Sequence, residues 1–296
     1  MTRRRGTKKR LHRKKLHRKR TRRLQRGGDN SKPVVVFTLT NNAGFGSVFG
    51  FLLKAYIYAK KEGKNFLIKS DNWQFGDGWH DYFTSLDVYD PAAKYANEEN
   101  YKHGSVGRIP EYSLGEYMNA VKEIYTPKPE IVNRAKAFTD KIGGPYISVY
   151  IRRGDKTSGT GKEMDAADLP KLVEEMGVSG GNVFVMSDDY SVVEEITKLL
   201  PKCKIFTMTP PENRGLVIYN IQKYDSEQKK KHADELFTSM EVFNGGEKGW
   251  VDNRSNIGRF LKIRGGDKIT LYPSDMAPKN LTAETIVDPP NRSLGI

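Results

Sequence analysis

The sequence carries two neighbouring arginines, Arg152 and Arg153, directly after the apolar run at residues 146–151. A planar guanidinium group binds phosphate through paired N–H donors, so two of them at the end of a strand could hold a diphosphate. Asp155 and Lys156 follow closely, and the carboxylate would orient an arginine or the lysine. We therefore predict an anion site here, with a surface ion-pair cluster as the alternative.

Two further polar clusters follow a predicted strand or open a predicted helix. Asp188 and Asp189 come after the apolar residues 183–186, where carboxylates could hold ribose or sugar hydroxyls, or where Asp188 could cap the next helix. Ser255 and Asn256 open a helical segment whose free backbone N–H groups and dipole favour an anion. Ordinary capping by Ser255 explains that pair equally well.

Gly44 and Gly46 give a weaker, glycine-rich signal. Phe49 stands where a G-x-G-x-x-G pattern needs its third glycine, so the dinucleotide fingerprint is excluded. Two interpretations remain, which are close approach of the backbone to a ligand and a simple tight turn.

The elements that must position these residues alternate between strand and helix. In chain order they are a strand at 34–39, a helix capped by Ser47 and running to about 61, a strand at 65–68, helical character at 113–141 broken at Pro127 and Pro129, a strand at 146–151, a helix at 165–176, a strand at 183–186, a helix at 190–200, a strand at 204–207, a helix at 227–243 and a last helix from about Ser255. This alternation predicts an α/β fold with parallel sheets, in which ligands bind at the carboxyl ends of the strands. The turn at 143–145 predicts two domains, 33–144 and 145–296, after a tail at 1–32.

Charge is distributed unevenly along the chain of 296 residues, whose formal net charge is +14. Residues 1–26 contain 15 of the 50 Lys and Arg and no acidic residue, which leaves 35 against all 36 Asp and Glu. The body is therefore nearly neutral, and a basic nucleic-acid-binding fold is not required. For the tail, which we expect to be disordered, two interpretations stay open: an arm for a polyanion or an anionic membrane surface, and a solvated extension.

Other patterns exclude several classes of protein. No run reaches the ~18 apolar residues of a membrane span, and the N-terminus lacks the apolar region of a secretory signal. Cys203 is the single cysteine, so no internal disulfide or zinc cluster is possible. The five histidines show no metal-ligand spacing. We expect a soluble, cytoplasmic protein without a bound metal.

Three motifs in this order resemble those of the fucosyltransferase superfamily, which includes α-1,6-fucosyltransferases, rhizobial nodulation fucosyltransferases and, more distantly, protein O-fucosyltransferases. Residues 149–156 are similar to that family's His-Val-Arg-Arg-x-Asp-Lys segment, residues 183–189 to its strand ending in (Thr/Ser)-Asp-Asp, and residues 255–259 to its Ser-Ser-x-Val-x-Arg motif. Residues 42–46 and 73–83 match the places of its first glycine-rich loop and its Trp-rich segment. The resemblance covers about residues 34–272. It indicates a viral or microbial member of the family rather than an animal one.

The resemblance implies a GT-B-like architecture, with two Rossmann-like domains facing a cleft. The first would be the acceptor side and the second would bind the nucleotide sugar. It implies inverting transfer from GDP-fucose to a hydroxyl of a glycan or glycoprotein, without a metal or other cofactor. The donor-binding residues that it implies are Gly44, Gly46, Arg152, Arg153, Asp155, Asp188, Asp189, Ser255, Asn256 and Arg259. Arg152 would also be catalytic, neutralising the β-phosphate, and Glu163 would be the base with Lys156 as its partner and Asp165 as a rival.

One departure from the family pattern and one ambiguous segment leave alternatives. Tyr150 replaces the family's histidine, a guanine-side contact, which keeps open the same fold with another nucleotide-sugar donor. A catalytically inactive polyanion-binding protein is the other alternative. The aromatic segment at 73–83 either stacks on a glycan or fills the core, and we favour the core. A viral protein of this kind would act in the host cytoplasm.

Overall fold

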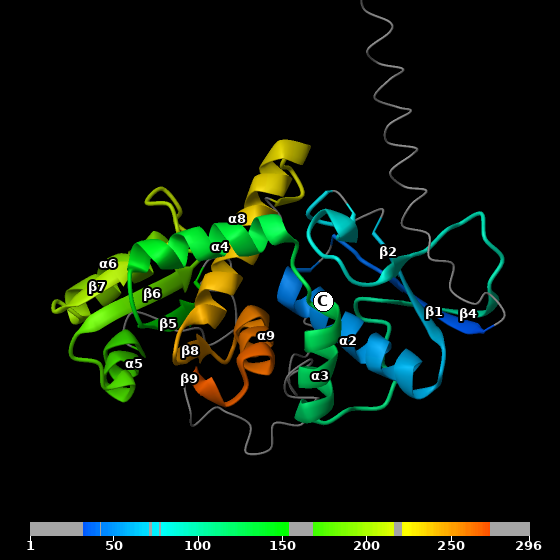
Figure 1. The fold of residues 1–296 in the computed structure, drawn as a ribbon, viewed down its shortest axis with the longest axis horizontal. Helices are drawn as coiled ribbons and strands as arrows, with labels where there is room; N and C mark the ends of the chain where they lie inside the picture. Colours follow the sequence, from blue (N-terminus) through cyan, green and yellow to red (C-terminus); the bar gives the residue numbers. More distant parts are fainter. Residues whose placement is uncertain are drawn as a thin grey trace, which may run out of the picture.

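The chain builds two parallel β-sheets with helices packed around them (Figure 1). The computed structural model describes residues 32–41, 43–70, 73–76, 78–153, 168–215 and 221–272. Within these residues, the first sheet has the order β3-β2-β1-β4, formed by β1 (Pro33–Thr38), β2 (Asn65–Lys69), β3 (Asp87–Val88) and β4 (Ala96–Lys102). The second has the order β7-β6-β5-β8-β9, formed by β5 (Tyr146–Ile151), β6 (Gly181–Ser187), β7 (Cys203–Phe206), β8 (Gly249–Asp252) and β9 (Ile269–Tyr272). An α/β fold with parallel sheets is therefore confirmed.

Helices connect the strands in both halves. They are α2 (Phe45–Lys61), α3 (Leu114–Ile124), α4 (Pro129–Ile142), α5 (Asp168–Met176), α6 (Tyr190–Leu199), α8 (Ser226–Gly245) and α9 (Asn256–Gly265), with short 3₁₀ turns η1 (Trp79–Asp81) and η3 (Gly266–Lys268). The predicted strands and helices named above all have counterparts among these elements. The sequence did not predict β3, β4, β8 or β9.

Strand β1 illustrates why the apolar runs became buried parallel strands. Val35 and Phe37 pack into the main core, whereas Val34 and Val36 pack with Leu67 on the opposite face of the sheet. All four β1 side chains are at most 1% exposed. A strand covered on both faces needs apolar residues at every position, which is the pattern the sequence shows.

The helical segment before the second sheet divides where the prolines predict. Ser113 and Glu116 form a capping box at the start of α3, and α4 begins at Pro129, where the missing N–H costs no helical hydrogen bond. Although α4 precedes the turn at 143–145, it lies along α8 (Figure 1), and Phe138 contacts Phe184 of β6 with ring centroids 5.7 Å apart. The chain thus crosses to the second sheet at the Pro127 break, and the domain limits 33–144 and 145–296 stay a prediction.

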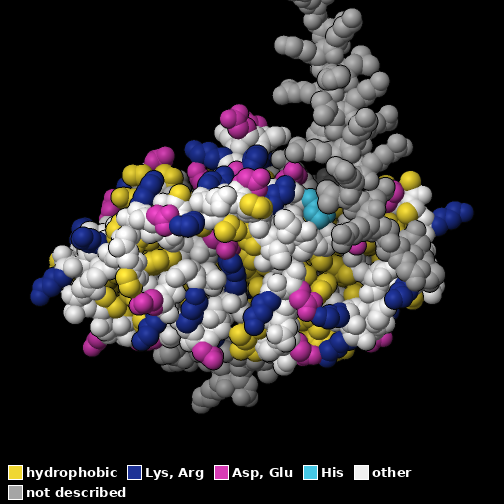
Figure 2. Space-filling view, in the orientation of Figure 1, with side chains coloured by type: hydrophobic (Ala, Val, Ile, Leu, Met, Phe, Trp, Pro, Cys, Tyr) yellow, Lys and Arg dark blue, Asp and Glu magenta, His cyan; other side chains and the backbone are white. Residues whose placement is uncertain are grey.

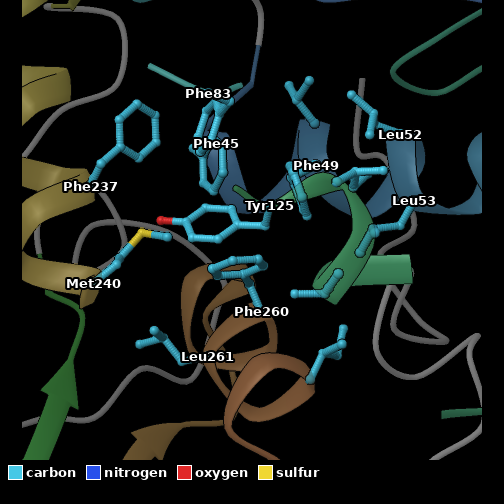
Figure 3. Packing of buried hydrophobic residues seen from close by; sticks show 14 of the residues in the cluster. Phe45, Phe49, Leu52, Leu53, Phe83, Tyr125, Phe237, Met240, Phe260 and Leu261 are labelled. Carbon is cyan, nitrogen blue, oxygen red and sulfur yellow. The ribbon is translucent and has the colours of Figure 1, made fainter. Parts of the chain in front are cut away.

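One aromatic cluster joins the two halves (Figure 3). The ring of Phe45 on α2 lies 5.1 Å from that of Phe237 on α8 and 5.6 Å from that of Phe260 on α9. These rings meet edge to face, which is a favoured arrangement for aromatic pairs. Because α2 belongs to the first half and α8 and α9 to the second, burial of this cluster holds the halves together.

The Trp-rich segment fills the core rather than the surface. Trp79, Tyr82 and Phe83 are fully buried, and Trp73 is 3% exposed. The indole N–H of Trp79 donates a hydrogen bond of 2.8 Å to the carbonyl oxygen of Ser85, so burial leaves that group satisfied. The core interpretation of this segment is confirmed.

Candidate active site

A cavity of about 760 Å³ lies where residues following β1, β5, β6 and β8 meet. The first half contributes Gly44, Gly46 and Ser47, and the second contributes Arg152, Asp188 and Ser255. Carboxyl ends of parallel strands meet at one edge of a sheet, which explains why segments far apart in the sequence gather here.

Both sheets have a reversal of strand order, and residues that follow the strand at each reversal, β1 and β5, line this cavity. In the second sheet, β6 and β7 lie on one side of β5, and β8 and β9 on the other. In the first sheet, β2 and β3 lie on one side of β1 and β4 on the other. Open α/β sheets bind ligands at such reversals, because the connections diverge there and leave a crevice. The strand order and the polar clusters therefore indicate the same ligand site.

Arg152 lines the cavity as the sequence predicted. Its guanidinium Nη1 lies 3.3 Å from Oδ2 of Asp188, and its side chain is 16% exposed. The carboxylate therefore orients a cation that remains accessible from the cavity. At this position Arg152 could bind an anion such as a phosphate, and its assignment to the donor phosphate stays a prediction.

Arg153 is placed differently, because it does not line the cavity. Its guanidinium group forms paired hydrogen bonds of 2.7 and 3.0 Å to Glu195 and another of 3.0 Å to Ser191, both on α6. Side chains of adjacent residues leave a strand on opposite faces, so one arginine turns to the cavity and the other to the helix. This position ties Arg153 to α6, while its assignment to donor binding and the orienting role of Asp155 stay predictions.

The two aspartates have separate roles. Asp188 lines the cavity, and its Oδ1 accepts a hydrogen bond of 2.9 Å from the backbone N–H of Arg153. Asp189 caps α6 by accepting a hydrogen bond of 2.8 Å from the backbone N–H of Ser191. The capping role therefore belongs to Asp189, whereas Asp188 braces the loop that carries Arg152.

Ser255 is the N-cap of α9, but its hydroxyl makes no capping bond. The hydroxyl instead lies 2.9 Å from that of Tyr150, which is 4% exposed. Burial raises the pKa of Tyr150 well above its usual value, so the phenol stays neutral. The first N–H groups of any α-helix lack partners within the helix, and those of α9 begin at Asn256, which lines the cavity. An anion could be held at this helix end.

Arg259 is buried and does not line the cavity. Its Nε donates a hydrogen bond of 2.9 Å to the carbonyl oxygen of Asn253, and its Nη1 lies 3.3 Å from the side-chain oxygen of Asn256. The prediction that Arg259 binds the donor directly is not supported by this position. Arg259 instead holds the backbone at Asn253 and the side chain of Asn256, the first residue of α9.

Gly46 brings two helix starts together. A Cβ built on Gly46 would lie 2.6 Å from the carbonyl carbon of Asn256 and 2.7 Å from the backbone nitrogen of Ile257. The close backbone approach predicted for the glycine turn therefore exists, but its partner is α9. Helix α2 starts with Gly44 as its N-cap, whereas Ser47, the predicted cap, is the third residue of the helix.

Several predicted residues lie outside the described part of the chain. These are Asp155, Lys156, Glu163 and its rival Asp165, as well as the basic tail at 1–26. Their assignments stay predictions.

The sequence reasoning missed two residues that line the cavity, Arg254 and His232. Arg254 pairs with the buried Asp252 at 3.0 Å and with Asp168 at 3.5 Å. Burial, and then the charge of Arg152, lower the pKa of His232 to about 4. Arg254 directly precedes the motif at residues 255–259, which is a signal that could have found it, whereas nothing in the sequence around His232 marks it.

Charge and metal binding can be assessed over the described residues alone. Within them, no group of three or more His, Cys, Asp or Glu side chains is arranged to hold a metal ion. Figure 2 shows acidic and basic side chains interspersed on the face in view, as a nearly neutral body requires. Among the helices in the described ranges, none combines the length and apolar character that a membrane span needs.

Comparison by sequence finds neither a matching family model nor a matching curated protein. Comparison by structure finds NodZ α-1,6-fucosyltransferase soaked with GDP-fucose, with a TM-score of 0.56 and 13% identity, covering 79% of this chain and 92% of that one. POFUT1 in complex with GDP matches with a TM-score of 0.50 and 13% identity, covering 83% and 100%. A mutant of Arabidopsis thaliana FUT1 in complex with GDP matches with a TM-score of 0.50 and 11% identity, covering 87% and 74%.

Proposed function

We propose that this chain, whose fold is fucosyltransferase-like, is an inverting glycosyltransferase that transfers fucose from GDP-fucose to a hydroxyl of a glycan or glycoprotein. The observation that carries the proposal is the meeting of Arg152 with the N-terminal end of α9 at one cavity, at the strand reversal of the second sheet. In this proposal the two sheets belong to a GT-B-like pair of domains, and the cavity is the cleft.

The chemistry requires stabilisation of a departing diphosphate. As the bond between the sugar C1 and the β-phosphate oxygen breaks, its electron pair stays with GDP. Negative charge then develops on that phosphate, and the sugar becomes cationic. Preorganised donors stabilise such charge better than water does, because they need no reorganisation. We assign this role to Arg152, assisted by the first N–H groups of α9 and by the hydroxyl of Ser255, without a metal ion.

Asp188 has a supporting role in this proposal. Its Oδ2 holds Arg152 and its Oδ1 holds the backbone of Arg153, so one carboxylate fixes both the side chain and the loop. The acceptor hydroxyl must approach C1 from the face opposite GDP and lose its proton. Glu163 with Lys156 remains the base proposed from the sequence.

A second donor is favoured by one specific observation. Tyr150, which replaces the family's histidine, is buried and its hydroxyl is paired with Ser255. A guanine bound where the family's histidine would contact it therefore meets a tyrosine instead. A glycosyltransferase that uses another nucleotide sugar is the second candidate.

A panel of nucleotide sugars, followed by nucleotide release with and without acceptor glycans, tests the proposal. GDP-fucose is expected to give the highest turnover, and Arg152→Gln is expected to lower kcat at least ~100-fold, as loss of one oxyanion-stabilising donor does. The control is Arg134→Gln, which removes an exposed arginine that pairs with Asp234 and does not line the cavity. Turnover by the Arg152 variant equal to wild type would refute the phosphate assignment, and a preference for another donor would replace GDP-fucose.

A further inference from the structure

The reversal in the first sheet carries its own pair of polar side chains. Strand β1 leads to Ser47 in the first turn of α2, and the residue directly after β4 is His103. Ser47 and His103 therefore meet at this reversal of strand order. Ser47 belongs to the first half of the protein and Arg152 to the second, and both residues line the cavity.

The two side chains are hydrogen-bonded. The Oγ of Ser47 lies 2.8 Å from Nε2 of His103, although 56 residues separate them in the chain. The ring of Phe51, one turn along α2, meets the imidazole edge to face with centroids 4.8 Å apart. These contacts fix the orientation of the imidazole. Ser47 lines the cavity and His103 does not, so the imidazole is connected to the cavity through Ser47.

The position of Ser47 relative to the proposed donor follows from the neighbouring glycine. Gly46 abuts the backbone of Asn256 at the start of α9, where the diphosphate is proposed to lie. Ser47 is the next residue, on the wall formed by the first half. Inversion requires the acceptor to approach C1 from the face opposite the leaving group, and the proposal below needs Ser47 to reach that face.

The carboxylates of Glu212 and Glu235 also line the cavity and are rival bases, whereas two other polar groups are less suited to take a proton from the acceptor. On the same wall, the amide of Gln74 is oriented to bond with the backbone of Ala43 and Phe45. Across the cavity, His232 lies beside Arg152, and its pKa of about 4 makes it a weak base. Among the described residues, the Ser47–His103 pair thus combines access to the cavity with a proton acceptor behind it.

We propose that Ser47 and His103 form a proton relay for the acceptor hydroxyl, a role that rests on the proposed function. The acceptor oxygen bonds to C1 as the bond from C1 to the β-phosphate oxygen breaks. The acceptor proton passes to Oγ of Ser47, and the proton of Ser47 passes to Nε2 of His103, while GDP leaves with the bonding electron pair. The resulting imidazolium, which is partly exposed, then loses its proton to solvent. Ser47 touches the substrate, whereas His103 acts through it.

The test compares steady-state transfer by five full-length variants with that of wild type. His103→Gln keeps an oxygen that accepts the serine hydrogen bond but cannot hold a proton. Ser47→Ala removes the relay, and Ser47→Thr retains a hydroxyl. His80→Gln is a matched control for a histidine outside the cavity, and Glu163→Gln tests the rival base.

We expect His103→Gln and Ser47→Ala to lower kcat at least ~100-fold, the usual contribution of a general base, with the donor KM and GDP affinity within about threefold of wild type. Ser47→Thr should recover most of kcat, and the His80 control should match wild type. A kcat of His103→Gln near wild type would overturn the relay alone. If Glu163→Gln loses turnover and His103→Gln keeps the turnover of wild type, the base is Glu163 instead. Absence of transfer by wild type would overturn the proposed function itself.

Discussion

Replacing Gly46 by alanine tests whether the contact between α2 and α9 shapes the anion site. The new Cβ would lie 2.6–2.7 Å from three backbone atoms of Asn256 and Ile257. Carbon atoms in contact prefer a separation of ~3.5–4.0 Å, so the two helix starts must separate by about 1 Å. Backbone atoms cannot move aside as a flexible side chain would.

The expected magnitude follows from two opposing effects. Alanine favours a helix over glycine by ~1 kcal/mol, whereas overpacking in a dense region costs ~1–3 kcal/mol. We expect a net loss of about 0–2 kcal/mol in the free energy of unfolding. Displacement of the α9 N–H groups removes hydrogen bonds to a charged group, each contributing ~1.5–3 kcal/mol, so GDP affinity should fall at least ~10-fold.

Urea unfolding and calorimetric titration with GDP measure the two effects. Gly107→Ala is the matched control, because a Cβ on Gly107 has no heavy atom within 4 Å and should change neither quantity. A Gly46→Ala protein that is more stable than wild type and binds GDP equally well would refute the reasoning.

Three further predictions concern Arg153, His232 and the tail. Arg153→Gln breaks the ion pair with Glu195 and should cost roughly 2–3 kcal/mol of stability in urea unfolding, with GDP affinity within threefold; a large loss of affinity at full stability would place Arg153 at the donor instead. Because His232 has a pKa of about 4 in the fold against ~6.5 unfolded, the unfolded chain binds the extra proton, so stability should fall as pH drops from 6.5 to 4, by at most roughly 2–3 kcal/mol. His232→Gln should flatten that window, and parallel profiles of the two proteins would contradict this. Removing residues 1–26 should abolish salt-sensitive binding of inorganic polyphosphate while leaving transfer unchanged, and undiminished polyphosphate binding would show that the tail is not the arm.

The apolar strands and the polar residues that follow them could be predicted from the sequence. Continuous runs such as β1 and β5 have one stable placement in an α/β fold, covered on both faces. Arg152, Asp188 and Ser255 come directly after such runs or at a helix start, and all three line the cavity. The sequence therefore showed both the chemical type of these residues and their place at the end of a strand or the start of a helix.

What the sequence could not decide is which of two adjacent side chains faces the cavity. Arg152 and Arg153 have the same chemistry, and their different directions depend on Glu195, which is 42 residues from Arg153. Asp188 and Asp189 divide their roles in the same way. Local patterns carry no information on such distant partners.

The Ser47–His103 pair depends on an element without a hydrophobic pattern. Strand β4, Ala-Asn-Glu-Glu-Asn-Tyr-Lys, is an edge strand that pairs with β1 through its backbone, and most of its side chains are polar. Because none of the β4 side chains is fully buried, the strand has no apolar periodicity and was not predicted. The location of His103 therefore became visible only in the fold.

The most direct test of the central claim is a crystal structure of this protein with GDP-fucose bound. We predict that the β-phosphate lies within hydrogen-bonding distance of the Arg152 guanidinium and of the backbone N–H groups that begin α9 at Asn256, with the fucose directed toward Ser47. A diphosphate bound away from both Arg152 and α9 would contradict the proposed site.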